Sequence, residues 1–355
     1  MSIDAFTYSP NAARIVFGYG SLSRIGEEIQ RLGCKRVLVL STPGHLQHAE
    51  RVAETLGAAA SGIFDGAVMH VPIETALAAR AEARRTHADG IVAIGGGSTT
   101  GLAKAIALEL PVPIVAIPTT YAGSEMTPIY GLTEGGSKRT GREPKVLPKC
   151  VIYDPALTHE LPIPLSIASA MNAIAHAAEG LYAADRNPVT DLLAEAGIRA
   201  IASAIPKLVA DPHDRDARSD CLYGAWLCGT VLGMVGMGLH HKLCHTLGGA
   251  FGLPHAETHG CLLPHALAYN ASCATSAMTS IARALGRPSA PAGLYELAAE
   301  SGATLALRDI GLREDQIDRA VDLAIASPYP NPRPLERAAL RRLIVNAWAG
   351  ERPLD

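Results

Sequence analysis

The chain has 355 residues, of which 48% are hydrophobic and 18% charged, and its formal net charge is -3. This length predicts about two domains with sizeable cores, and the charge, without long runs of one sign, argues against nucleic-acid or membrane-surface binding. No secretory signal and no Cys-x-x-Cys motif are visible, so we expect a cytoplasmic protein whose cysteines are reduced thiols.

The first half of the chain alternates short β-rich runs with helical patterns. Strands are expected at residues 36–42, 61–66, 90–97 and 113–120, with helices at 45–57, 73–87 and 98–110 between them. Two further strands, at 127–133 and 146–153, are expected to complete this half. Alternation at this spacing predicts a parallel sheet covered by helices, and we assign residues 1–157 to an α/β, Rossmann-like domain.

From about residue 165 the sequence is rich in Ala and Leu with helical period, broken by Pro and Gly. We therefore expect an all-α C-terminal domain over residues 158–355. Residues 221–239 carry no charge, but five glycines dilute the stretch, which favours a buried helix over a membrane span. Buried glycine-rich helices also suit subunit contacts, and a homodimer is expected.

A glycine loop, Gly95-Gly96-Gly97-Ser98, follows an apolar strand and opens a helix. Glycines let phosphate oxygens approach the backbone, and the first turn of a helix offers unpaired N–H groups. The loop lacks the P-loop lysine, and Thr100 stands where G-x-G-x-x-G needs its third glycine. Phosphate binding is therefore weighed against a simple tight turn.

A second polar loop, at residues 118–125, follows the next strand, and two such loops at adjacent strand ends suit a dinucleotide. The earlier strand ends in hydroxyls, not in an acidic residue, which predicts NADH use with NADPH tolerated. Lys145 opens an apolar run and is expected to point inward, whereas residues 138–142 are interpreted as a solvated loop. The expected cofactor-binding residues are Ser41, Thr42, Gly95, Gly96, Gly97, Ser98, Thr119, Thr120, Ser124 and Lys145.

Six histidines fall within residues 240–265, and a seventh, His176, stands four residues after Asn172. The pairs Asn172/His176, His241/His245 and His255/His259 are spaced i,i+4, which puts two polar groups on one helix face. Such a cluster indicates either a cation that polarises a substrate oxygen or imidazoles that donate protons directly. A zinc-protease helix at 255–259 is disfavoured because its glutamate sits one place late. Structural roles are expected for His240 and His265.

These motifs together resemble the iron-containing alcohol dehydrogenase family, which has a dehydroquinate-synthase-like fold. The resemblance spans the chain and is carried by residues 95–98, 118–125, 154–155, 172–180 and 241–255. Within that family, residues 124–134, 171–179 and 253–259 are similar to the maleylacetate reductases.

The resemblance implies that metal-dependent members hold their metal with an aspartate and three histidines. Those motif positions are occupied here by Asn172, His176, His241 and His255. An amide supplies an oxygen but no negative charge, so a divalent cation would lose its only anionic protein ligand. No metal is therefore predicted, in line with maleylacetate reductases being regarded as metal-free.

The resemblance also implies NAD(P)H-dependent reduction of the C=C bond of maleylacetate, a small dicarboxylate, to 3-oxoadipate in the degradation of aromatic compounds. The developing enolate then needs a hydrogen-bond donor and the adjacent carbon a proton. The expected catalytic residues are His245 and His241 first, supported by His255, His259 and His176, with Lys242 as a candidate for a substrate carboxylate. The alternatives are a metal-dependent alcohol dehydrogenase or aldehyde reductase and a catalytically silent dinucleotide-binding protein.

Overall fold

The computed structural model describes residues 6–11, 13–135 and 137–353, without the side chains of residues 137–138. The chain divides into two compact units, one of Pro10–Leu161 and one of Pro162–Asp355 that also takes in the chain before Pro10. The predicted domain boundary follows residue 157, and the compact units divide after Leu161.

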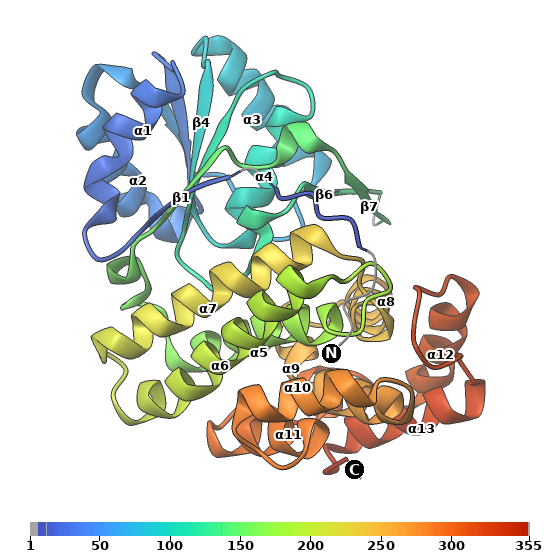
Figure 1. The fold of residues 1–355 in the computed structure, drawn as a ribbon. Coiled ribbons are helices and arrows are strands. Elements are labelled where there is room, and N and C mark those ends of the chain that lie inside the picture. The colour runs from blue at the N-terminus through green and yellow to red at the C-terminus, as the bar shows by residue number, and fades with distance from the viewer. Residues whose placement is uncertain (1–5, 12, 136, 354–355) are drawn as a thin grey trace. The chain divides into compact units, whose positions relative to one another are not determined.

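The first unit contains a parallel sheet of six strands in the order β1-β8-β5-β4-β2-β3 (Figure 1). The strands are β1 (Arg14–Phe17), β2 (Val37–Leu40), β3 (Ala60–Phe64), β4 (Gly90–Gly95), β5 (Ile114–Pro118) and β8 (Cys150–Tyr153). Helices α1 (Ile25–Arg31) and α2 (Leu46–Leu56) share one apolar core with the sheet, and α3 (Ile73–Arg85) and α4 (Gly97–Ala107) share another. Because β2, β4 and β5 are buried throughout, their sequences are continuous apolar runs. The α/β prediction is confirmed.

A separate antiparallel hairpin departs from the prediction. Strand β6 (Ile129–Glu134) pairs with β7 (Ser137–Arg142), and neither strand joins the main sheet. The interpretation of residues 138–142 as a loop was therefore wrong. The exposed Arg139 and Arg142 misled it, because a two-stranded ribbon outside a sheet tolerates charged side chains in water. The side chain of Lys138 lies outside the described residues.

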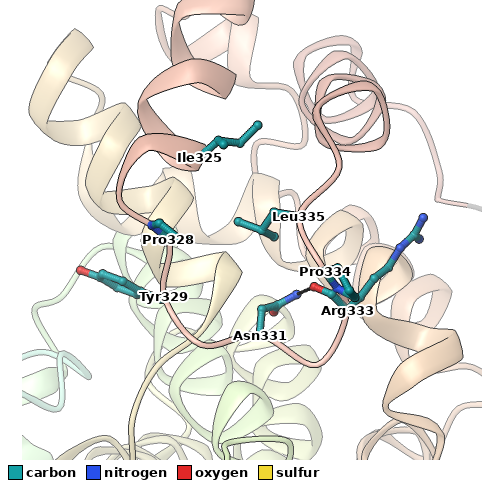
Figure 2. A pocket seen from close by; sticks show the side chains of 7 residues that line it. All are labelled: Ile325, Pro328, Tyr329, Asn331, Arg333, Pro334 and Leu335. Carbon is teal, nitrogen blue, oxygen red and sulfur yellow. Dashed lines mark hydrogen bonds between the residues drawn. The ribbon is translucent and has the colours of Figure 1, made fainter.

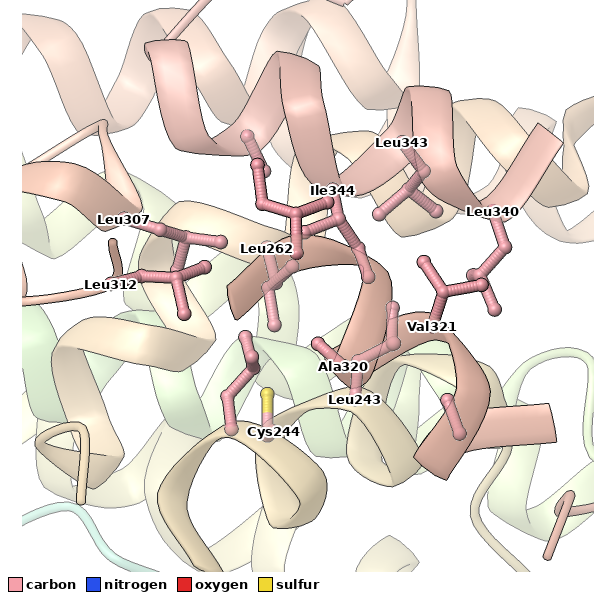
Figure 3. Close-up of a cluster of buried hydrophobic side chains, with 14 of the residues drawn as sticks. Leu243, Cys244, Leu262, Leu307, Leu312, Ala320, Val321, Leu340, Leu343 and Ile344 are labelled. Carbon is pink, nitrogen blue, oxygen red and sulfur yellow. The ribbon is translucent and has the colours of Figure 1, made fainter. Parts of the chain in front are cut away.

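The second unit is helical, as predicted. Its helices are α5 (Ile163–Gly180), α6 (Pro188–Ala210), α7 (Arg215–Met234), α8 (Leu239–Phe251), α9 (His255–Asn270), α10 (Thr275–Leu285), α11 (Ala290–Glu300), α12 (Ile317–Ala326) and α13 (Arg337–Ala349). An apolar core joins α8, α9, α12 and α13 around Leu243, Leu262 and Ile344 (Figure 3). No single helix among the described residues is long and apolar enough to cross a membrane; α7 and α8, bent by 95°, meet the criteria only as a pair.

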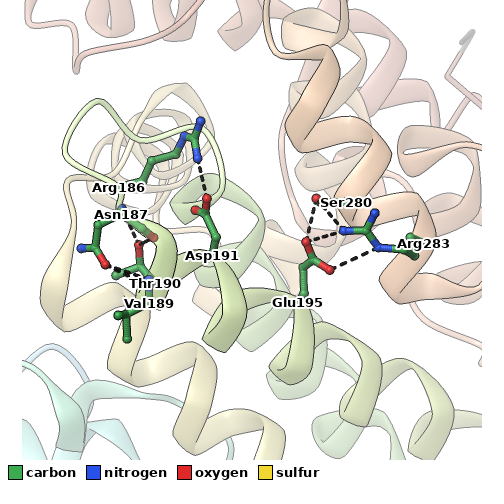
Figure 4. Close-up of polar contacts among 8 residues, drawn as sticks. All are labelled: Arg186, Asn187, Val189, Thr190, Asp191, Glu195, Ser280 and Arg283. Carbon is green, nitrogen blue, oxygen red and sulfur yellow. Dashed lines mark hydrogen bonds and ion pairs between the residues drawn. The ribbon is translucent and has the colours of Figure 1, made fainter. Parts of the chain in front are cut away.

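Helix α6 is fixed at its start and on its flank by polar contacts (Figure 4). The Asn187 side chain accepts hydrogen bonds from the backbone N–H groups of Val189 and Thr190, which otherwise lack partners in the first turn. Along the helix, Glu195 accepts hydrogen bonds from Ser280 and Arg283 of α10. These contacts fix the start and one side of α6 and do not involve α8 or α9.

Candidate active site

The two predicted cofactor loops lie side by side at the carboxyl ends of β4 and β5. Gly95 pairs with Pro118 in the sheet, and the Thr119 N–H donates to the carbonyl of Gly95. A Cβ added to Gly96 would lie 3.2 Å from the Thr120 side chain, so the two loops approach closely and a side chain there would have to displace Thr120 slightly. Helix α4 begins at Gly97 with no side-chain cap, and its first N–H groups remain available to an anion. Ser98 lies half-buried in that first turn.

Buried hydroxyls mark the same edge of the sheet. The Oγ atom of Ser41, after β2, and the Oγ1 atoms of Thr99 and Thr119 are buried without hydrogen-bond partners in the described part of the chain. Buried hydroxyls are normally paired, so three unpaired ones suit a polar ligand. Thr42, in contrast, contacts the Nδ1 atom of His45 at 2.8 Å. The edge therefore fits the nucleotide that the sequence predicts.

The fully buried Lys104 of α4 anchors the second loop and was missed by sequence reasoning. Its Nζ donates to the carbonyl oxygens of Ser124 and Ile129 at 2.6 and 2.7 Å and to Thr127 Oγ1 at 2.9 Å. Burial lowers the pKa of Lys104 to about 7, partly offset by nearby Glu125. Three acceptors match the three donors of an ammonium, which favours the charged form. A lysine on a helix of small apolar residues was the available signal.

Lys145 does not point inward, so that prediction was wrong. Its exposed side chain donates from Nζ to the carbonyl oxygen of Leu108 at 2.6 Å. Leu108 is the C-cap of α4, where a cation satisfies a terminal carbonyl and the helix dipole. Helix α4 has 11 residues, so its two ends lie about 16 Å apart at 1.5 Å per residue. Lys145 is therefore remote from the glycine loop.

Three helices of the second unit bring the predicted polar residues together. Helix α5 carries Asn172 and His176, α8 carries His241, and α9 carries His259, all of them buried. The ring of His241 stacks on that of His176 at 5.2 Å between centroids and meets the ring of His259 edge-on at 4.9 Å. The predicted i,i+4 pairs thus lie on helices, and the three histidine rings converge.

Glu179, which sequence reasoning missed, is the carboxylate of this cluster. It lies on α5, is fully buried and contacts the Nδ1 atom of His241 at 2.6 Å. Burial alone would raise the pKa of Glu179, but the hydrogen bond to His241, the nearby imidazoles and the Gly238 N–H lower it to about 2. Its spacing three residues after His176, on the same helix face, was the available signal.

The deepest imidazoles are kept neutral. Burial first, and neighbouring imidazoles second, lower the pKa values of His176 and His259 well below the usual range. Burial likewise lowers the pKa of His240 to about 3, and its Nε2 atom contacts His259 Nδ1 at 2.9 Å. His240, expected to be structural, is therefore part of the same network of rings.

His265 lies deeper in α9, and burial lowers its pKa to about 4. Because the folded-state pKa lies below the unfolded value of about 6.5, this residue's contribution to stability is complete above that pH and is lost as pH falls. The loss should reach about 3 kcal/mol at pH 4. We expect His265→Phe to flatten the decline in Tm between pH 6.5 and 4, measured by calorimetry. An unchanged decline would contradict this, and Tm at pH 7 serves as the reference.

One end of the cluster is open to solvent. His245 and His255 are exposed, and the ring of His255 meets that of His259 at 4.5 Å. The Nδ1 atom of His245 lies 3.1 Å from the hydroxyl of Tyr329, and Lys242 lies 5.6 Å from the centre of the Tyr329 ring. Tyr329 was missed because it comes from a proline-rich loop far along the chain.

The Tyr329 loop also lines a pocket of about 340 Å³ (Figure 2). Asn331 holds this loop to α9 through reciprocal amide hydrogen bonds with Asn270, at 2.9 and 2.7 Å. Arg333 lies over the ring of Tyr269, 4.3 Å from its centre. The loop is therefore well anchored, and Tyr329 is held beside His245.

The quartet Asn172, His176, His241 and His255 fits a divalent cation poorly. In its favour, Asn172 Oδ1, His176 Nδ1 and His241 Nε2 are buried without partners among the described residues. Against it, the quartet has no anionic member, and His255 is exposed. Among the described His, Cys and acidic residues, a different trio has its ligand atoms within 4.8 Å of one another. It consists of His240, Cys244 and His259. The donor set thus lacks the charge and the convergence of a divalent-metal site.

Comparisons with known proteins cover nearly the whole chain. A model for iron-containing alcohol dehydrogenase matches residues 12–155, and one for the C-terminal part of the Fe-containing alcohol dehydrogenase family matches residues 166–348. Maleylacetate reductase from Burkholderia cepacia is 60% identical over 99% of this chain and 100% of its own. Maleylacetate reductase 1 from Cupriavidus pinatubonensis is 56% identical over 98% of each chain.

Solved structures agree with the sequence comparisons. The crystal structure of maleylacetate reductase from Agrobacterium tumefaciens superposes with a TM-score of 0.96 at 51% identity, covering 99% of this chain and 100% of that one. Full-length similarity at this level, together with both family models, assigns the two units to a single family. The chain belongs to the iron-containing alcohol dehydrogenase family.

Proposed function

We propose that the protein reduces the C=C bond of maleylacetate to 3-oxoadipate with a nicotinamide cofactor, as a step in the degradation of aromatic compounds. The observation that carries this proposal is the similarity to maleylacetate reductases over the full chain, at 60% identity for the Burkholderia cepacia enzyme. The replacement of an anionic metal ligand by Asn172 supports a reductase of an activated double bond over a metal-polarised alcohol dehydrogenase.

The cofactor is of the NAD type, as membership of the family implies. When bound, the nicotinamide supplies a hydride to the alkene carbon β to the ketone, and the substrate then carries negative charge as an enolate. The chain has to stabilise that oxygen and deliver one proton to the adjacent carbon. Its own contribution is therefore hydrogen-bond donors and an acid.

His245 is the best placed of the histidines for contact with a substrate. It is exposed, whereas His176, His241 and His259 are buried. Its Nδ1 atom lies 3.1 Å from the Tyr329 hydroxyl, which orients the ring. We assign His245 the donor or acid role, with Tyr329 as its partner and His241, His255, His259 and His176 in support.

Lys242 is proposed to bind one substrate carboxylate. It is half-buried beside His241 and lies near the Tyr329 ring, so its charge is held close to His245. An ammonium in this position favours a dicarboxylate over a neutral aldehyde through charge pairing. This preference separates the proposed substrate from the simple carbonyl compounds of the alternative.

We further propose that the reaction needs no metal. The support is the poor fit of the Asn172 quartet to a divalent cation, whose direct ligands would all be neutral. NADH is the proposed cofactor, with NADPH tolerated, because the neutral Ser41 and Thr42 at the end of β2 repel a 2′-phosphate less than a carboxylate would. A homodimer in the cytoplasm, with no nucleic-acid or membrane partner, stays a prediction.

The test is NADH oxidation followed with maleylacetate, with and without a chelator. We expect turnover in both conditions, slower turnover with NADPH, and little turnover with small aldehydes. A preference for NADH above about a thousandfold in kcat/KM would contradict NADPH tolerance. Activity with aldehydes alone, lost on chelation, would favour the metal-dependent alcohol dehydrogenase. No oxidation with any keto acid would favour a silent dinucleotide-binding protein.

A further inference from the structure

Glu179 accepts hydrogen bonds from backbone N–H groups at the start of α8. Its Oε1 atom accepts from the backbone N–H of His240 at 2.8 Å, and its Oε2 atom accepts from that of Gly238 at 2.9 Å. Gly238 is the N-cap of α8 and has no side chain to cap the helix. A carboxylate from α5 therefore acts as the capping group, which the N–H groups and the dipole of α8 both favour.

The same carboxylate also contacts the ring of His241, the third residue of α8. Oε2 lies 2.6 Å from Nδ1 of His241, and the backbone N–H of His241 donates to it at 3.3 Å. Three backbone N–H groups, those of Gly238, His240 and His241, donate to the Glu179 carboxylate, which favours its ionised form. An ionised carboxylate only accepts hydrogen bonds, so Nδ1 of His241 has to carry a hydrogen. The neutral tautomer protonated at Nε2 alone is thereby excluded.

The opposite nitrogen of the ring is buried as well. Nε2 of His241 is buried without a partner in the described part of the chain, as is Oδ1 of Asn172. The ring itself stacks on His176. Asn172, His176 and Glu179 are spaced along one face of α5. One helix therefore supplies both the carboxylate that contacts Nδ1 of His241 and the imidazole that stacks on its ring.

We propose that Glu179 is a positioning residue that fixes the Nδ1–H form of His241 and, by capping α8, the place of its ring in the cluster. The proposal rests on the proposed function, because the cluster is taken to support reduction of maleylacetate. Carboxylates that hold a functional imidazole in this way commonly change activity by about 10- to 100-fold when they are removed. Glu179 contacts neither the cofactor edge nor His245 through any hydrogen bond described above.

Glu179→Gln is the sharpest substitution, because it keeps the shape of the side chain but replaces one acceptor by a donor. In one orientation of the amide, the new NH₂ group faces the His240 N–H and that hydrogen bond is lost. In the other orientation it faces the Gly238 N–H and the His241 ring, and those two hydrogen bonds are lost. We expect the Nε2–H form of His241 to appear and kcat for maleylacetate to fall by about 10- to 100-fold. The KM for NADH should change by less than about twofold.

The tautomer is read by ¹⁵N NMR of protein labelled in its histidine rings, with His241 assigned from the spectrum of His241→Gln. Asn187→Ala is the matched control, because it removes a cap of α6 in the same unit away from the cluster. It should lower Tm but leave the His241 signal and kcat unchanged. Glu179→Asp keeps the negative charge and serves as the test if the Gln variant does not fold. The kcat of the Asp variant should fall in proportion to the fraction of His241 that no longer carries its hydrogen on Nδ1.

A merely structural Glu179 would lower Tm in both variants while His241 keeps its Nδ1–H signal, and that result overturns the proposal. A fall in kcat without a change of tautomer overturns it as well. Failure of the proposed function looks different, because the unaltered protein would not oxidise NADH with maleylacetate while its His241 signal could still be read.

Discussion

Replacing His245 by alanine is expected to lower kcat for maleylacetate by about a hundredfold or more. The ring is exposed on α8, and its Nδ1 atom is held 3.1 Å from the Tyr329 hydroxyl. Loss of a positioned acid typically removes a factor of about 10² to 10⁴. Stopped-flow and steady-state measurement of NADH oxidation would give the effect, and KM for NADH should be nearly unchanged.

The control is His213→Ala, which removes another exposed imidazole of the helical unit, in the turn between α6 and α7. It should retain full activity. Tyr329→Phe tests the partner, and the double variant should lose less than the product of the two single effects, because the two side chains act as a pair. A near-normal kcat for His245→Ala would remove this residue from the mechanism.

If the reaction is metal-free, as proposed, replacing Asn172 by aspartate is expected to create a divalent-metal site. Asn172 lies four residues before His176 on α5, and its buried Oδ1 atom has no hydrogen-bond partner in the described chain, so the substitution adds a negative charge with little change in shape. At an effective dielectric constant of 20, a unit charge about 4 Å away is worth about 4 kcal/mol per unit charge of the cation. We expect stoichiometric zinc or iron after purification without chelators.

Stability gives a second measurement of the same substitution. A buried carboxylate without a cation is costly, so the Asn172→Asp variant should melt below the unaltered protein when metal is removed. Zinc at about 100 times its Kd should restore about 2.7 kcal/mol. Asn172→Leu controls for the loss of the amide and should show no response to metal. Stoichiometric metal in the unaltered protein, with activity lost on its removal, would refute the metal-free proposal.

The fold could be predicted largely from local patterns. Buried parallel strands such as β4 and β5 are continuous apolar runs, and helices such as α5 carry their period in the sequence. β1 was not foreseen, because four residues at a sheet edge, half of them exposed, carry little pattern. β7 was taken for a loop because Arg139 and Arg142 are exposed and carry no apolar pattern.

Site residues could be predicted where their spacing along one helix puts them on the same face, as for Asn172 and His176. Contacts between distant segments leave no such trace, which is why Tyr329 was missed and Lys145 was misplaced. Glu179 was overlooked because a glutamate in a helix is usually a solvated residue, and only packing against the start of α8 shows its burial. Lys104 was missed for the same reason.

The pairing of β1 with β8 has a consequence for how the first unit forms. β1 lies at the edge of the sheet, and its partner residues, Cys150–Tyr153, come at the far end of the same unit. A ribosome releases β2, β3, β4 and β5 long before β8, so these strands can pair with one another while β1 still lacks its partner strand. Contacts between such distant segments form late and slowly because a large loop has to close first. The first strand to be synthesised is therefore expected to be among the last to be placed.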